Sequence, residues 1–269
     1  MTETTTQRNH STGSLSRGRT SPIDQVQLFE RKYDPLTRDI IGALPLDRSW
    51  RCLELGAGGG SMAGWLAGRA DRGSVLAVDV DTSHLTTVHA EPPANLTIRQ
   101  ADIADADFAP GSFDLVLARA VFEHLAEPAA VLERAVRWLA PGGWLVVEDF
   151  YYLPPEDSIS EVGRTLIEGY LRRMRAQGAD LWWGRRLPAS LASAGLTSVA
   201  SRVTPAGPGQ SAADDELIAL RMRQEGHVLV DNGVVTAEQL ADFVGSLGDP
   251  RVRDTTTLLV SAWGQRPTA

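Results

Sequence analysis

Four glycines crowd into five positions directly after an apolar segment, in the run Leu53-Glu54-Leu55-Gly56-Ala57-Gly58-Gly59-Gly60-Ser61. Glycines at such a turn allow positive φ angles and let a ligand approach the main chain closely. The next residues favour a helix, whose N-terminal amides bind polar or anionic groups. The run therefore predicts a nucleotide-like cofactor at the carboxyl end of a first parallel strand.

The glycine spacing alone leaves two cofactor classes open. The dinucleotide fingerprint G-x-G-x-x-G/A fails when it is counted from Gly56, because its third position is Ser61. Counted from Gly58, however, Gly60 and Ala63 satisfy it. The acid Glu54 favours a cofactor with a cationic part, since a pyrophosphate at the same place would meet its negative charge.

Further motifs follow at regular intervals. Asp79 ends the apolar segment 75–79, and Asp102 follows the segment 96–100. These two acids belong to a set with the E-x-G-x-G-x-G pattern of residues 54–60. The set also includes two later motifs, Phe113-Asp114-Leu115-Val116 and Ala140-Pro141-Gly142-Gly143. In order and spacing this set resembles the class I S-adenosylmethionine-dependent methyltransferases, from about residue 30 to residue 264.

The resemblance implies how S-adenosylmethionine, and its product S-adenosylhomocysteine, would be held at the methionine end. Glu54 would organise the ammonium group, and Arg119 would lie beside the methionine through its main chain. The loop under this part of the cofactor would consist of Gly56, Ala57, Gly58 and Gly60.

The resemblance also implies contacts at the nucleoside end. Asp79 would accept both ribose hydroxyls, and Val80 would lie against the adenine. Asp102 would accept from the adenine amino group, with Ile103 on the ring face. The alternative for each acid, including Glu54, is an ordinary capping carboxylate at a strand end.

Composition bounds the class of protein. The 269 residues, 43% hydrophobic and 22% charged, suffice for one large α/β domain. The net charge of -8 disfavours nonspecific binding to nucleic acid or to an anionic membrane. No apolar run is long enough to span a bilayer, and the polar tail 1–21 lacks a signal core and is expected to be disordered. With a single cysteine, Cys52, a cytoplasmic enzyme is the default expectation.

Apolar segments alternate with helical patterns, which predicts a mostly parallel sheet. We expect a Rossmann-like α/β fold of seven strands, the last antiparallel, within residues 22–269. Residues 22–150 would form the cofactor-binding core, and 187–204 and 255–269 would complete the sheet. The predicted strands are 51–55, 75–79, 96–100, 113–118, 144–150, 197–204 and 256–263; the helices are 23–34, 61–70, 82–90, 128–139, 158–178, 186–195, 213–225 and 236–247.

Two insertions, 151–186 and 205–254, emerge at the carboxyl edge of this sheet, where open α/β sheets bind ligands. We therefore predict a helical lid over a small substrate, with the helix 23–34 covering the same side. The alternative is that these helices only thicken the fold or form the contact of a homodimer.

Candidate catalytic groups follow the fourth and fifth strands. His124 is the best general base, because imidazole titrates near neutral pH, although the Glu-His-Leu sequence also recurs in this family as a structural element. Asp149 is a second candidate base or orienting acid, and Glu123 is either a substrate contact or a helix-start carboxylate. Aromatic and neighbouring residues expected at the substrate are Phe29, Tyr33, Tyr151, Tyr152 and Trp183, with core packing as the alternative for each.

Several substrate classes do not fit the loop after the fourth strand. It lacks the Asn/Asp-Pro-Pro-aromatic turn of the family's DNA amino-methyltransferases and the clustered acids of its metal-dependent catechol type, so no metal is expected. We predict methyl transfer to an O, N or C atom of a small metabolite, as in secondary or quinone metabolism. The alternatives are a cofactor-binding scaffold for a non-methylating reaction such as cyclisation, a noncatalytic partner subunit, and a nicotinamide dehydrogenase.

Overall fold

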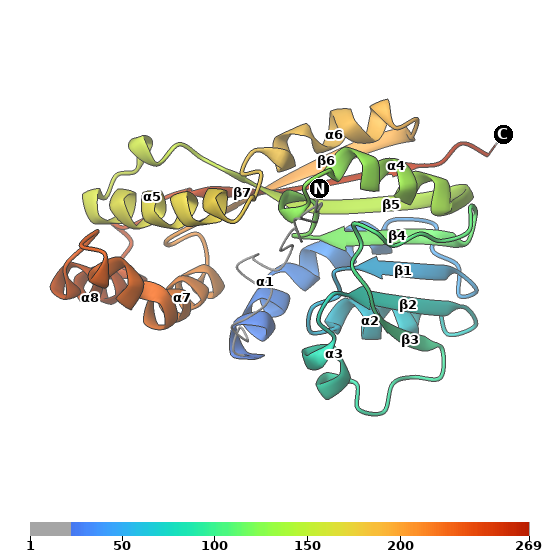
Figure 1. Ribbon diagram of the computed structural model, residues 1–269, viewed down its shortest axis with the longest axis horizontal. Coiled ribbons are helices and arrows are strands. Elements are labelled where there is room, and N and C mark those ends of the chain that lie inside the picture. Colours follow the sequence, from blue (N-terminus) through green and yellow to red (C-terminus); the bar gives the residue numbers. More distant parts are fainter. Residues whose placement is uncertain (1–22, 269) are drawn as a thin grey trace, which may run out of the picture.

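The computed structural model describes residues 23–268; the tail predicted to be disordered lies outside the described residues. One seven-stranded sheet, in the order β3-β2-β1-β4-β5-β7-β6, forms its centre (Figure 1). The strands are β1 (Arg51–Leu55), β2 (Ser74–Asp79), β3 (Leu96–Gln100), β4 (Phe113–Arg119), β5 (Leu139–Tyr152), β6 (Thr197–Ala206) and β7 (Thr257–Gln265). Strands β1 to β5 are parallel, and β7 runs antiparallel to both β5 and β6. The predicted sheet, with its antiparallel last strand, is confirmed.

Helices cover both faces of the sheet. The helices are α1 (Ile23–Gly42), α2 (Ser61–Arg69), α3 (Ser83–Val88), α4 (Pro128–Trp138), α5 (Glu161–Ala176), α6 (Trp183–Ser193), α7 (Ala212–Asp231) and α8 (Ala237–Ser246), with short 3-10 turns η1 (Phe122–His124) and η2 (Pro155–Asp157). The buried faces of α4 and α6 pack on one side of the sheet, where Trp138 and Leu187 are fully buried. The C-terminal part of α1, together with α2 and α3, packs on the other, around Ile41 and Leu66. The result is a three-layer sandwich.

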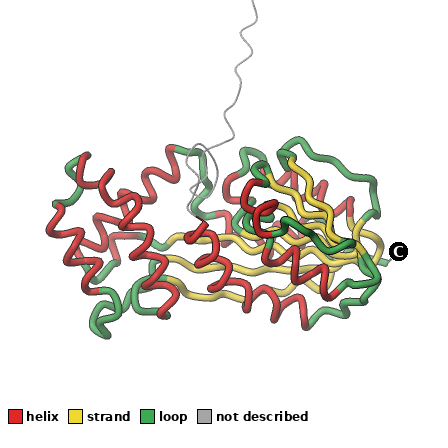
Figure 2. Tube along the Cα trace, turned by 90° about the horizontal axis from the view of Figure 1, so that it is seen from below, coloured by secondary structure: helices red, strands yellow, loops and turns green. Residues whose placement is uncertain are grey.

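Three helices form a separate group beyond the carboxyl ends of the parallel strands (Figures 1 and 2). Helices α5, α7 and α8 share a small core of their own around Leu166, Met222 and Phe243. We call these three helices the helical cluster. Helix α1 lies between the cluster and the sheet and contacts α7. The cluster comes from the segments 151–186 and 205–254, and its action as a lid over a substrate stays a prediction.

Two elements extend beyond their predicted ends. Helix α1 was expected to stop before Pro35, but it continues to Gly42. Ile40 and Ile41 are buried against the sheet, and this burial outweighs the helix-breaking effect of Pro35. Strand β5 begins at Leu139, because Leu139 pairs with Phe113 of β4 before the Pro-Gly-Gly turn at residues 141–143, and it continues to Tyr152, because its pairing with β7 extends that far. No helix of the described residues is long and apolar enough to cross a membrane.

Candidate active site

The glycine loop lies between β1 and α2 and is anchored to the neighbouring strand. The backbone amides of Gly56 and Ala57 both donate to the carbonyl of Val78 in β2, at 2.8 and 3.1 Å. Gly56, Gly58 and Gly60 have φ angles of 66°, 57° and 85°. A Cβ on Gly58 would meet nothing within 4 Å, so this glycine borders open space. The predicted cradle, a loop that a ligand can touch through its main chain, has the geometry that its glycines allow.

Acidic side chains surround the start of this loop. Glu54 is 6% exposed, and its Oε2 atom is buried without a hydrogen-bond partner among the described residues. Burial raises the pKa of Glu54 to about 8, although the charge of Arg119 acts in the opposite direction. Glu30 of α1 accepts a hydrogen bond from the amide of Ser61, at 3.3 Å, and burial raises its pKa too. With Asp34 also acting on Glu54, carboxyl groups outnumber the guanidinium, which suits a cationic ligand and not a pyrophosphate.

The acids predicted for the nucleoside end lie where β2 and β3 stop. Asp79 accepts from the amides of Gly58 (2.9 Å) and Asp81 (3.0 Å), so it ties β2 to the glycine loop. Burial raises its pKa. Asp102 accepts from the amide of Ala104 at 2.9 Å, and the adjoining Ile103 is buried. Each carboxylate keeps lone pairs for a ligand, so both the capping and the binding interpretation stand.

Arg119 has more structural contacts than the sequence predicted. Its guanidinium reaches α1, where it bonds to Asp34 Oδ1 at 2.7 Å and to Thr37 Oγ1 at 2.8 Å. Thr37 also donates to Glu148, which accepts from Ser261 Oγ at 2.6 Å. These buried groups hold α1 across the carboxyl edge of β4 and β5.

The turn after β4 links the glycine loop to a pocket. A Cβ on Gly56 would lie 2.3 Å from Val121 Cγ2, so the loop and the turn are in contact. Three residues after Val121, His124 Nε2 lies 3.3 Å from Glu123 Oε1, with the His124 side chain 21% exposed and that of Glu123 3% exposed. Glu123 also accepts from the amide of Phe150 at 3.1 Å. A carboxylate held by the main chain thus lies beside the imidazole, and a general-base role of His124 remains a prediction.

Asp149 lies under this turn and not at the pocket. Its side chain is fully buried, and its Oδ1 atom accepts from the amide of Val121 at 2.9 Å. Burial, followed by the charge of Glu123, raises its pKa well above the usual range. Oδ1 thus holds the turn, whereas Oδ2 is buried without a hydrogen-bond partner among the described residues, and the predicted role of Asp149 as a base or orienting acid stays a prediction.

A pocket of about 100 Å³ opens at the carboxyl edge of the sheet, between α1, the turn after β4 and the helical cluster. Of the predicted residues, Phe29, Tyr33, Glu123, His124 and Tyr152 line it. The lining residues that the sequence analysis did not name include Lys32, Tyr170, Asp214 and Arg221. These come from α1, α5 and α7, which only the tertiary fold brings together; no local motif marks them.

Two predicted substrate residues are elsewhere. Trp183 is 5% exposed and stacks on Phe122, with ring centroids 6.2 Å apart, in the core beneath α6. Tyr151 does not line the pocket, and the guanidinium of Arg185 lies 5.9 Å from its ring centroid. Because β5 alternates its side chains between two faces, Tyr152 and Phe150 point to the pocket and Tyr151 points away.

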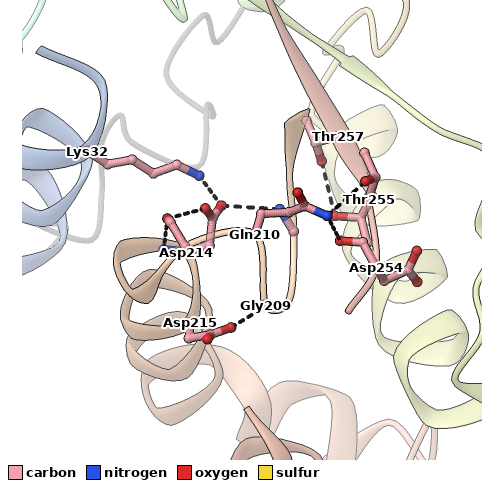
Figure 3. Close-up of polar contacts among 11 residues, drawn as sticks. Lys32, Gly209, Gln210, Asp214, Asp215, Asp254, Thr255 and Thr257 are labelled. Carbon is pink, nitrogen blue, oxygen red and sulfur yellow. Dashed lines mark hydrogen bonds and ion pairs between the residues drawn. The ribbon is translucent and has the colours of Figure 1, made fainter. Parts of the chain in front are cut away.

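An ion pair closes one side of the pocket. Lys32 of α1 bonds to Asp214 in the first turn of α7, and both side chains are at most 8% exposed (Figure 3). Asp214 also accepts from Ser211 Oγ at 2.5 Å and from the amide of Gly207 at 3.2 Å. The pair fixes α7 of the helical cluster onto α1.

Comparison with known proteins agrees with this geometry. Residues 53–147 match the family model described as "Methyltransferase domain". "Methyltransferase str3" of Strobilurus tenacellus is 31% identical over 162 residues, which are 59% of this chain and 57% of that protein. The chain spans about half the length of the first curated relatives that it matches.

Solved structures share the fold over most of the chain. A phosphoethanolamine N-methyltransferase 2 of Haemonchus contortus, in complex with phosphomonomethylethanolamine and S-adenosylhomocysteine, superposes with a TM-score of 0.62 at 17% identity, covering 91% of this chain and 58% of that one. The [4+2]-cyclase SpnF superposes with a TM-score of 0.57 at 17% identity, covering 89% of this chain and 82% of that one. Fold, motifs and family match agree: residues 53–147 match a methyltransferase domain, and the described chain has the Rossmann-like fold of the class I S-adenosylmethionine-dependent methyltransferases.

Proposed function

We propose that this protein transfers a methyl group from S-adenosylmethionine to a small-molecule acceptor in the pocket at the carboxyl edge of its sheet. The observation that carries the proposal is the contact between Gly56 and Val121, because it places the glycine loop directly beside the turn that lines the pocket. A methyl donor on the loop and an acceptor in the pocket would therefore be neighbours, and such positioning is the main contribution of an enzyme to this displacement.

The residues of the loop fit this cofactor. Glu54, with a buried and unpartnered oxygen, would hold the ammonium group, and Asp79 would hold the ribose hydroxyls. Val80, Asp102 and Ile103 would surround the adenine. When bound, the cofactor supplies an electrophilic methyl group on a sulfonium sulfur, which becomes a neutral thioether after transfer. The acidic surroundings of Glu54 favour that cationic donor over a nicotinamide dinucleotide.

The pair Glu123–His124 supports a hydroxyl as the acceptor. With Nε2 of His124 beside Glu123, the Nδ1 atom remains to accept the hydroxyl proton as the new O–CH₃ bond forms. Phe29, Tyr33 and Phe150, whose ring centroids lie 4.7 to 6.2 Å apart, would exclude water from the reaction. A role in secondary metabolism and a cytoplasmic location belong to the same proposal.

Calorimetric titration with S-adenosylmethionine, S-adenosylhomocysteine and NAD tests the cofactor. We expect binding of both sulfur nucleotides and no binding of NAD; binding of neither sulfur nucleotide would refute the proposal. Product mass then tests the reaction with a panel of hydroxylated metabolites. A product heavier by one methyl group supports the methyltransferase. A product of unchanged mass favours the alternative, a cyclisation; the structural neighbour SpnF is named as a [4+2]-cyclase.

A further inference from the structure

The charged groups of the pocket do not all compensate one another. Lys32 is paired with Asp214, and Glu123 is held by His124 and by the amide of Phe150. Arg221 of α7 lines the same pocket, yet no carboxylate of the described residues lies within ion-pair distance of it. Arg221 therefore stands at the α7 wall without an ion-pair partner, while the negative charge of Glu123 lies at the His124 end of the same pocket.

The environment of Arg221 makes that charge available to a ligand. Its Nε atom is buried without a hydrogen-bond partner among the described residues. The nearest acidic influence is Glu225, whose carboxylate is already bonded to Arg173 at 2.7 Å. The guanidinium instead lies 4.9 Å from the ring centroid of Tyr170. Because burying an unpaired charge is costly, a bound anion would stabilise this arrangement.

Three tyrosines surround the same point. Tyr33, Tyr152 and Tyr170 come from three different elements, all line the pocket, and all interact electrostatically with Arg221. Burial raises the pKa of Tyr33 and Tyr152, so their hydroxyl groups remain protonated donors. A guanidinium fork with phenolic donors around it is suited to a carboxylate or a phosphate.

Charge favours the carboxylate. The one guanidinium of Arg221 balances a monoanion, whereas a phosphate monoester would bring nearly twice that charge. The pocket, about 100 Å³, admits only a small ligand. Its walls are aromatic or aliphatic, with Phe29, Phe150, Leu217 and Ile218 among them.

We propose that the acceptor is a small aromatic carboxylic acid, whose carboxylate is bound by Arg221 and the hydroxyl groups of Tyr33, Tyr152 and Tyr170. The inference rests on the proposed function, because it names the substrate class of that site. The negative charge of Glu123 repels the carboxylate from the His124 end of the pocket. The acid is therefore oriented with its carboxylate at Arg221 and its methyl-accepting hydroxyl toward His124.

The test is an NMR titration of the full-length protein, saturated with S-adenosylhomocysteine, with benzoate, benzamide and phenyl phosphate as probes. We expect benzoate to bind about tenfold more tightly than benzamide, the discrimination that one charged hydrogen-bonding group provides. Arg221→Gln should weaken benzoate binding about tenfold and remove the preference over benzamide, and Arg221→Lys should restore part of it. Arg223→Gln, an exposed position of the same helix, should leave both affinities unchanged.

Each other outcome overturns the inference. No binding of benzoate to the unaltered protein, equal affinity for benzoate and benzamide, or unchanged benzoate binding in Arg221→Gln would refute the carboxylate site. Tighter binding of phenyl phosphate than of benzoate would assign the site to a phosphate instead. Titration of S-adenosylhomocysteine separates the two proposals: if it fails to bind the unaltered protein, the methyltransferase function fails, and if it binds while acids show no preference, only the inference fails. Thermal unfolding of Arg221→Gln verifies that the variant is folded.

Discussion

The glycine loop and the pocket lie side by side at one edge of the sheet, but the chain builds them in different ways. The loop and its acid Glu54 lie within residues 54–60, and only Asp79 joins them from the next strand. The pocket draws on α1, β5, α5, α7 and the ends of β6 and β7, which are spread over more than two hundred residues. A local motif can be recognised in a sequence, whereas a pocket assembled from distant segments cannot.

The two regions also differ in how their charges are arranged. Near the loop, the charges of Asp34, Glu30 and Asp79 act on Glu54 and are opposed by that of Arg119. In the pocket, the cations Lys32 and Arg221 equal the carboxylates Glu123 and Asp214 in number, and Arg221 is the cation without an ion pair among the described residues. The surroundings of Glu54 thus suit a cation, and those of Arg221 suit an anion. Changes in the loop should alter cofactor affinity alone, and changes in the pocket should alter turnover or acceptor affinity alone.

The largest effect is expected where the two regions touch. Gly56→Ala would place a Cβ 2.3 Å from Val121 Cγ2 on a residue with a φ of 66°. Left-handed strain and overpacking together should cost about 2–5 kcal/mol, seen as lower unfolding free energy and loss of S-adenosylhomocysteine binding. Gly68→Ala in α2, where nothing lies within 4 Å, is the control and should be neutral or stabilising. If Gly56→Ala binds the nucleotide normally, the loop is not the cradle.

The next effect belongs to the pocket alone. His124→Ala should lower kcat about a hundredfold, because it removes the proton acceptor, while the affinity for S-adenosylhomocysteine stays the same. Glu123→Gln should also lower kcat, since the imidazole loses its orienting carboxylate. Steady-state kinetics with an acceptor found in the metabolite panel measures kcat, and calorimetry measures the affinity for S-adenosylhomocysteine. If His124→Ala keeps full turnover, the enzyme acts only by positioning the methyl donor and the acceptor, without a general base.

A smaller effect is expected at the nucleoside end. Asp79→Ala should weaken binding of S-adenosylhomocysteine by about 1–3 kcal/mol, because a ribose hydroxyl loses its partner and the Gly58 amide loses its acceptor. Asp81→Ala, at the other end of the same turn, is the matched comparison and should change affinity less. Calorimetry that finds equal affinities for Asp79→Ala and the unaltered protein would contradict the ribose assignment.

The same contrast explains what the sequence could predict. The sheet and the positions of Glu54, Asp79 and Asp102 follow from strand periodicity and from turn residues that are neighbours in the chain. His124 was predicted as a base because it lies in the turn after β4, whereas Glu123 was predicted as a substrate contact or a helix-start carboxylate and not as a neighbour of the imidazole. Lys32, Tyr170 and Arg221 carry no local signal, since each is an ordinary helix residue until the helical cluster folds over the sheet. Asp149 and Trp183 are buried and do not line the pocket, which the sequence could not predict because burial at a strand end or helix start depends on what packs above it.

The last effect is a pH dependence of the loop, which should act on binding and stability in opposite directions. In the free protein the pKa of Glu54 is about 8, against an ordinary value of 4.5, because the carboxyl is buried. A raised pKa contributes its full stability below the unfolded value, and this contribution is lost as pH rises from there through about 8. The free protein should therefore lose stability between about pH 4.5 and pH 8, measured by chemical denaturation.

Cofactor binding should show the reverse slope. An ammonium group beside Glu54 requires the ionised carboxylate, so binding of S-adenosylhomocysteine releases a proton below pH 8, and affinity rises by up to about tenfold per pH unit. Calorimetry in buffers of different ionisation enthalpy counts that proton directly. Glu54→Gln should flatten both slopes, and benzoate affinity in the pocket should keep its own pH dependence in this variant. If proton release persists in Glu54→Gln, another group of the loop carries the titration, and Asp79, whose pKa burial also raises, is the next to be substituted.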